Sequence, residues 1–145
     1  MEVAYAVLAN AVEQSSDGKC YVLGFDVGRV VGNRYPLTIG SISLLTKLIF
    51  APEECGRQHH LSVSFSALGG ERLEPQIEQD FQAPPLENPE HQEHLRIGIT
   101  IAMQDLTIPA PGTYTFRLLV DGTEATTIRL AAEEIPGQPA EGQPE

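Results

Sequence analysis

Strict alternation of apolar and polar side chains along three segments is the feature that most constrains the fold of this chain. In residues 95–103, Leu, Ile or Met occupies every second position. Residues 61–67 alternate four apolar side chains with three serines, and residues 113–120 show the same period. A period of two places successive side chains on opposite faces of a β-strand. These segments therefore predict strands with one buried face, as in an antiparallel sheet that is exposed to water on its other side.

Weaker signals predict further strands between these three. In the first strand, Val3, Tyr5, Val7 and Ala9 are expected to face inward, with Leu8 outward. The other candidate segments are the run KCYVLGFDV after the turn SSDG, the nearly continuous apolar residues 42–50, an acid-flanked edge at 77–81, and residues 126–131 after Asp121-Gly122. Seven or eight short strands separated by turns predict an all-β fold, a single antiparallel β-sandwich of the immunoglobulin-like kind.

One domain is expected to occupy residues 1–132. A chain of 145 residues has the length of about one domain, and its 41% hydrophobic content is ordinary for a globular protein. Residues 52–58 form at most one helical turn, and the proline-rich residues 83–93 predict a surface loop. Residues 133–145 contain three prolines, two glycines and four acids. This composition predicts a disordered tail, because it buries too little apolar surface to offset the entropy of ordering.

The charge balance restricts the class of partner and the compartment. Twenty acids against nine bases give a net charge of −11, which disfavours nucleic acid and anionic membranes as partners. The opening residues lack the positive charge of a signal peptide, and no apolar run is long enough to span a membrane. Cys20 and Cys55 match no metal-ligand spacing. We expect two free thiols, with Cys20 as a small core residue, in a cytoplasmic protein.

Four segments of the sequence carry a family resemblance. They read VAYAVLANAVEQ, GKCYVLGFDV, ISLLTKLIFAPEECGRQHHLSVSF and PGTYTFRLLVDG. Over residues 1–132 the chain resembles a family of small uncharacterised bacterial β-sandwich proteins that is classed only as a domain of unknown function. The resemblance implies a stand-alone sandwich, and it implies no activity, cofactor or catalytic residue. Family members tend to have an Asp-Gly turn after the strand at 61–67, where this chain has Leu68-Gly69-Gly70.

Tyr114 stands at the start of the predicted strand 113–120. In immunoglobulin-like sandwiches a tyrosine at such a place forms a tyrosine corner, in which its hydroxyl bonds to backbone a few residues upstream. The other interpretation is a core aromatic side chain whose hydroxyl lies at the rim. Both interpretations give Tyr114 a structural role.

Four histidines form two pairs, each just before a predicted strand. They are His59 with His60, and His91 with His94. If the two loops converge, three imidazoles and a neighbouring carboxylate could bind one zinc or nickel ion. The other interpretation is that all four are rim histidines on polar loops. The pairs therefore define an alternative function, a small-ligand or metal-binding module.

No set of residues predicts catalysis. The sequence contains no G-x-S-x-G nucleophile elbow, and the acids next to Cys55 are expected to raise the pKa of its thiol. Glu78 and Asp80 share a strand face, where they could act as a hydrolase pair or bind calcium. A charged edge strand explains the same two acids. We predict no catalytic residue and no cofactor.

Apolar side chains on the second face of several strands predict that another surface covers them. They are Leu8, Leu23, Phe25, Leu45, Ile49 and Leu119. The cover could be loops, a second copy of the chain or a different partner, and a homodimer is the default form. We therefore expect a non-enzymatic protein that works by protein–protein contact, as a homo-oligomer or an accessory subunit.

Overall fold

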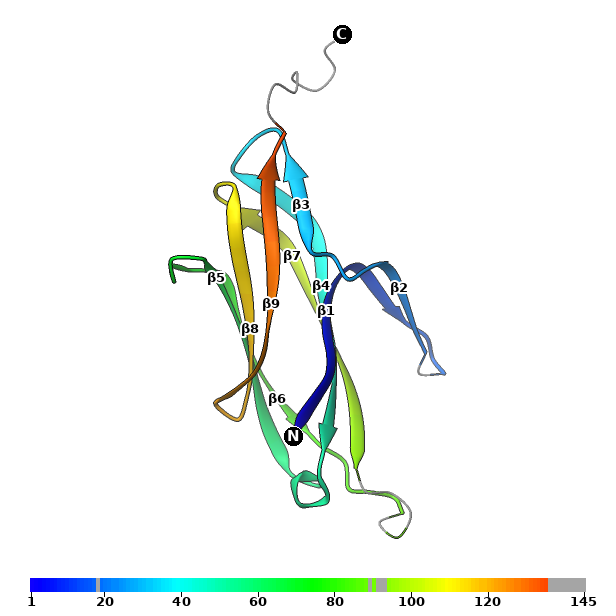
Figure 1. Ribbon diagram of the computed structural model, residues 1–145. Helices are drawn as coiled ribbons and strands as arrows, with labels where there is room; N and C mark the ends of the chain where they lie inside the picture. Colours follow the sequence, from blue (N-terminus) through cyan, green and yellow to red (C-terminus); the bar gives the residue numbers. More distant parts are fainter. Residues whose placement is uncertain (18, 89, 91–93, 136–145) are drawn as a thin grey trace.

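The computed structural model describes residues 1–17, 19–88, 90 and 94–135, and Figure 1 shows that they form two β-sheets. Nine strands and one 3-10 turn occur in this part of the chain. They are β1 (Glu2–Gln14), β2 (Cys20–Phe25), β3 (Arg29–Gly32), β4 (Leu37–Phe50), η1 (Pro52–Glu54), β5 (Gln58–Ala67), β6 (Arg72–Gln82), β7 (Leu95–Ile108), β8 (Gly112–Val120) and β9 (Thr123–Glu134). The all-β prediction is confirmed, although the described chain has more strands than the seven or eight expected.

The additional strand arises because the chain changes sheets directly after β2. The N–H of Val27 donates to the carbonyl oxygen of Leu8 in the first sheet, whereas the carbonyl oxygen of Gly28 accepts from Ala131 in the second. Residues 20–32 therefore form two strands in different sheets. The sequence pattern predicted a strand in KCYVLGFDV and none at residues 29–32.

The first sheet has the strand order β2-β1-β4-β7, and the second has the order β3-β9-β8-β5-β6. Strand β4 lies between two neighbours and β6 lies at an edge, as predicted from residues 42–50 and 77–81. The expectation of a purely antiparallel arrangement is wrong for one pair, because β3 runs parallel to β9. Asp121 and Gly122 join β8 to β9 with φ of 52° and 82°, the positive values that a tight hairpin turn of this kind requires.

One hydrophobic core lies between the sheets. Its fully buried large side chains are Leu8, Ile42, Leu44, Leu48, Phe50, Leu61, Phe65, Leu106, Ile108, Phe116, Leu118 and Leu130. The outward orientation expected for Leu8 is wrong. A register shift between Val3 and Tyr5 changes the alternation of β1, so that Leu8 faces the core and Tyr5 faces outward.

The last strand continues two residues past the domain boundary expected after residue 132. Strand β9 continues to Glu134, where Val31 and Gly32 of β3 pair with Glu133 and Glu134. Ile135 extends this pairing through a backbone hydrogen bond to Gly32. The backbone pairing with β3 keeps these polar residues in the sheet. The rest of the predicted tail, residues 136–145, lies outside the described residues.

Candidate interaction surface

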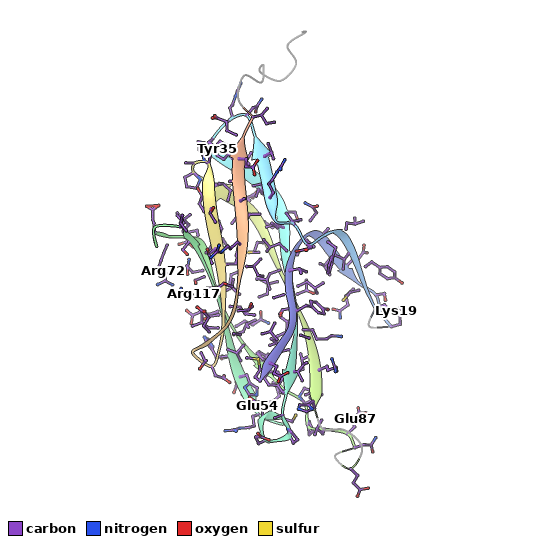
Figure 2. The ribbon with its side chains drawn as sticks, viewed as in Figure 1. Lys19, Tyr35, Glu54, Arg72, Glu87 and Arg117 are labelled. Atoms are coloured by element: carbon purple, nitrogen blue, oxygen red, sulfur yellow. The ribbon has the colours of Figure 1, made fainter. Side chains whose placement is uncertain are left out.

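The second half of β1 and all of β2 form a hairpin that leans away from the body of the molecule (Figure 1). The two strands pair from Gln14 with Cys20 to Ala9 with Phe25. Figure 2 shows Lys19 at the far end of this hairpin. At Gly24, φ is +67°, and a Cβ atom would lie 1.9 Å from the Oδ1 atom of Asn10. The hairpin therefore requires glycine at this position.

Three large apolar side chains share one face of β2. Tyr21, Leu23 and Phe25 stand at alternate positions and are 59%, 71% and 61% exposed. We call these three side chains the hairpin face. Contiguous exposed apolar surface is typical of contact sites, whereas scattered exposed aliphatic residues need no explanation.

The other predicted interface residues offer less surface. Leu45 is only 5% exposed, because it lies within its sheet between Val7 on β1 and Thr100 on β7. Ile49 and Leu119 are half-buried. Of the predicted set, Leu23 and Phe25 are therefore the residues that a partner can reach. Tyr21 was missing from that set, although the alternation that selects Leu23 and Phe25 also selects Tyr21.

Both cysteines are free, but the expectation that Cys20 lies in the core is wrong. Cys20 is exposed at the start of β2, because no strand of the second sheet in the described chain packs extensively against β2. Cys55 is half-buried, and its thiol donates to the carbonyl oxygen of Ala51. Burial raises the pKa of the Cys55 thiol, and the neighbouring carboxylates of Glu54 and Glu53 raise that pKa further.

His59 is a buried structural residue on β5. Its Nδ1 atom lies 2.6 Å from Oδ2 of Asp121, and its Nε2 atom lies 2.8 Å from the carbonyl oxygen of Glu54. The ring stacks on Phe50 with centroids 4.7 Å apart. Because both partners are acceptors, both ring nitrogens donate to them when the imidazole is protonated. Burial lowers the pKa of His59, but the hydrogen bonds to Asp121 and to the Glu54 carbonyl outweigh burial and raise it overall.

His60 lies on the opposite face of β5, between two carboxylates of β6. Its Nδ1 atom is 2.6 Å from Asp80, and its Nε2 atom is 3.0 Å from Glu78. The hydrogen bonds to Asp80 and Glu78 raise the pKa of this histidine. The sequence had singled out the histidine and the acids separately, and the pairing of β5 with β6 brings them together.

This arrangement does not bring the predicted metal ligands together. His59 and His60 point to opposite faces of the sheet, and each uses both ring nitrogens in hydrogen bonds. His94 is exposed just before β7, and His91 lies outside the described residues. Over residues 1–17, 19–88, 90 and 94–135, no cluster of three or more His, Cys, Asp or Glu side chains is arranged to hold a metal ion.

A shallow groove of about 510 Å³ lies on the outer face of the second sheet. It is lined by Ser62 and Ser64 of β5, by Arg72 and Glu78 of β6, and by Arg117 of β8. Figure 2 shows both arginines on the same side of the molecule. Leu119 lines the same groove. Arg117 also pairs with Glu124 at 2.7 Å, so part of its charge is already balanced.

Tyr114 forms the hydrogen bond that a tyrosine corner requires. Its hydroxyl donates to the carbonyl oxygen of Ala110 at 2.5 Å, and it accepts from the N–H of Ala110 at 3.3 Å. The ring is buried beside Phe65. The hydroxyl therefore ties the start of β8 to the residues that precede it.

Comparison with known proteins places the chain in a family without giving it an activity. No helix in the described part of the chain has the length and apolar character needed to cross a membrane. No curated protein matches the chain. A family model described as a family of unknown function, DUF6941, matches residues 4–133. This match covers all nine strands except the ends of β1 and β9. The chain therefore belongs to the DUF6941 family.

Proposed function

We propose that this protein is a non-enzymatic, cytoplasmic β-sandwich that works by protein–protein contact, and that the hairpin face is its contact surface. The observation that carries the proposal is the high exposure of Tyr21, Leu23 and Phe25 on one face of a projecting hairpin. Aromatic side chains at the centre of a contact contribute most of the binding free energy in many interfaces. Free thiols fit a reducing compartment.

The strand order of the two sheets, apart from β2, supports a finer proposal, that the fold is immunoglobulin-like. The order β1-β4-β7 in one sheet and β9-β8-β5 in the other follows the sheets ABE and GFC of that fold. The hydrogen bond of Tyr114 at the start of β8 is a further support. In this assignment β2 is an addition to the frame, and the addition carries the exposed apolar side chains.

Photo-crosslinking in the producing cells tests the contact function. A photoreactive amino acid replaces Leu23 in one full-length variant and Leu68 in a control. Leu68 is a matched control because it is 75% exposed but lies in the turn after β5. We expect a light-dependent protein adduct from position 23 and only background adducts from position 68. Equal labelling at the two positions would refute the proposal.

The alternative function, binding of a small ligand, is favoured by the groove rather than by the histidines. Arg72 and Arg117 beside hydroxyl groups outnumber the one acidic lining residue, Glu78, and suit an anionic ligand. Calorimetric titration with inorganic phosphate and with citrate tests this, using the Arg72→Ala variant as a comparison. Saturable heat that the variant loses would support the alternative. Absence of saturable heat in the native protein would remove it.

A further inference from the structure

Strand β2 has an unprotected free edge. In the described chain it pairs with β1 along one side only, so the backbone N–H and C=O groups of its other side have no strand partner. Its six residues, CYVLGF, include no charged residue and no proline. Natural edge strands are normally protected by charge, proline or short length, because a bare edge accepts another strand.

The other sheet edges differ from β2 in ways that discourage pairing. Strand β6 carries Pro75, Glu78 and Asp80, and β3 is only four residues long. Strand β7, all of whose residues are described, has no large apolar side chain among the exposed ones. Pairing at β7 would bring few apolar side chains together, whereas pairing at β2 would also bring the side chains of the hairpin face against apolar side chains of the added strand. Strand β2 is therefore the edge at which another strand gains most.

We propose that β2 pairs in antiparallel fashion with β2 of a second copy, about a two-fold axis at Leu23, so that two four-stranded sheets become one eight-stranded sheet. This inference rests on the proposed contact function and names its partner. Residues opposite each other in an antiparallel pair point to the same face. Leu23 then lies opposite Leu23 of the second copy, and Tyr21 lies opposite Phe25. The two hairpin faces form one continuous apolar ridge.

Self-complementarity favours a second copy over an unlike chain as the occupant. The strand needs a partner without charges and with apolar side chains at alternate positions, and β2 itself satisfies both conditions. Antiparallel pairing also places the start of one strand beside the end of the other. In this register Cys20 of one copy lies opposite Asp26 of the second copy and Lys19 lies opposite Val27, so that no two like charges face each other at either end. The interface is isologous and closes as a dimer.

The expected dimer is weak. A contact made by one strand pair buries less than the roughly 800 Å² per partner of a standard interface, so dissociation constants of about micromolar or weaker are expected. Introducing lysine at the centre of the contact, in the variant Leu23→Lys, should weaken dimerisation about thirtyfold or more. The matched variant Leu68→Lys should leave it unchanged. Sedimentation equilibrium measures both, with the dimer at twice the 15.8 kDa of one chain.

Disulfide trapping is the decisive experiment, because it reports the register. The background is the full chain with Cys20→Ser and Cys55→Ser, to which Leu23→Cys or Leu68→Cys is added. Under mild oxidant we expect Leu23→Cys to form covalent dimers at least about tenfold faster, since the two sulfurs meet at the two-fold axis. Urea unfolding of each variant checks that the fold is retained.

The outcomes separate this inference from the proposed function. Trapping of Leu23→Cys no faster than Leu68→Cys would overturn pairing with a second copy. If photo-crosslinking at position 23 still gave an adduct with a different protein, the contact function would stand and its partner would be an unlike chain. If neither experiment gave a product at position 23, both proposals would fail.

Discussion

Replacing Asp121 by alanine tests whether one side chain holds the β8–β9 turn and β5 together. Its Oδ2 atom accepts from His59 at 2.6 Å, and its Oδ1 atom accepts from the backbone N–H of His60 at 2.8 Å. Its own N–H donates to the carbonyl oxygen of His60. Asp121 also adopts φ of 52°, a conformation that aspartate tolerates better than alanine.

The expected loss can be worked out from these contacts. A hydrogen bond to a charged group contributes about 1.5–3 kcal/mol, and the lower value applies here because the carboxylate of Asp121 is half-exposed. Two such bonds give about 3 kcal/mol, and the left-handed backbone adds about 1 kcal/mol for alanine. We therefore expect Asp121→Ala to lower the free energy of unfolding by about 4 kcal/mol, a large part of the 5–15 kcal/mol typical of a domain.

Asp121→Asn is the sharper comparison. Asparagine tolerates the same φ and can still accept from the N–H of His60, while its amide can donate to Nδ1 of a neutral His59. We expect it to cost only about 1 kcal/mol. Glu124→Ala on the same hairpin removes an exposed pair with Arg117 and should cost less than about 1 kcal/mol.

Urea unfolding followed by circular dichroism at pH 7 measures all three variants, since the chain has no tryptophan for fluorescence. If Asp121→Ala proved as stable as the native protein, the carboxylate would not hold His59 and the turn. The reasoning from the hydrogen bonds would then be refuted.

Three further predictions concern the histidines, Tyr114 and two apolar residues of the first sheet, Leu45 and Leu23. The pKa values of His59 and His60 are raised above 6.5 in the folded state, so their contribution to stability is complete below pH 6.5 and is lost as the pH rises through the folded pKa values. The urea midpoint should therefore fall from pH 6 to pH 9, and a flat profile would contradict protonated histidines. Tyr114→Phe removes one hydroxyl and should lower the free energy of unfolding by about 1 kcal/mol. An unchanged urea midpoint would show that the hydrogen bond to Ala110 does not stabilise the fold. Leu45→Lys should destabilise the monomer by more than about 2 kcal/mol because it buries a charge, while Leu23→Lys should change stability by less than about 0.5 kcal/mol; thermal unfolding distinguishes them.

Local patterns predicted the strands well because side-chain alternation is a property of consecutive residues. The segments 61–67, 95–103 and 113–120 all lie within longer strands of the structure. The orientation of β1 was not predictable in this way. A register shift between Val3 and Tyr5 reverses the face to which each later side chain of β1 points, and the alternation of residues in the sequence does not reveal the shift. A single irregular pair therefore moved Leu8 from the expected surface to the core.

The histidine–carboxylate contacts required information on strand pairing. Strand β6 has a register shift opposite Ser64 and Phe65. A count of residues from the turn between β5 and β6 would therefore place His60 opposite a residue two positions away from its actual partner, Asp80. The neighbour of His59 lies even further away, since Asp121 is 62 residues later in the chain. No local pattern connects these residues, although Asp121-Gly122 was recognisable as a turn.

The exposure of the hairpin face follows from topology rather than from composition. The alternation in β2 indicates that one face of the strand is apolar, but it does not show whether that face packs on a second sheet or lies in solvent. Within the described part of the chain, β1 is the one element with which β2 makes extensive contact. The chain leaves the first sheet at Val27 and joins β9 at Gly28, so the second sheet begins beyond the hairpin. An apolar strand in this position exposes both its side chains and the unpaired backbone groups of its free edge to solvent. A second strand can satisfy both at once, whereas a loop or a small ligand can cover only the side chains.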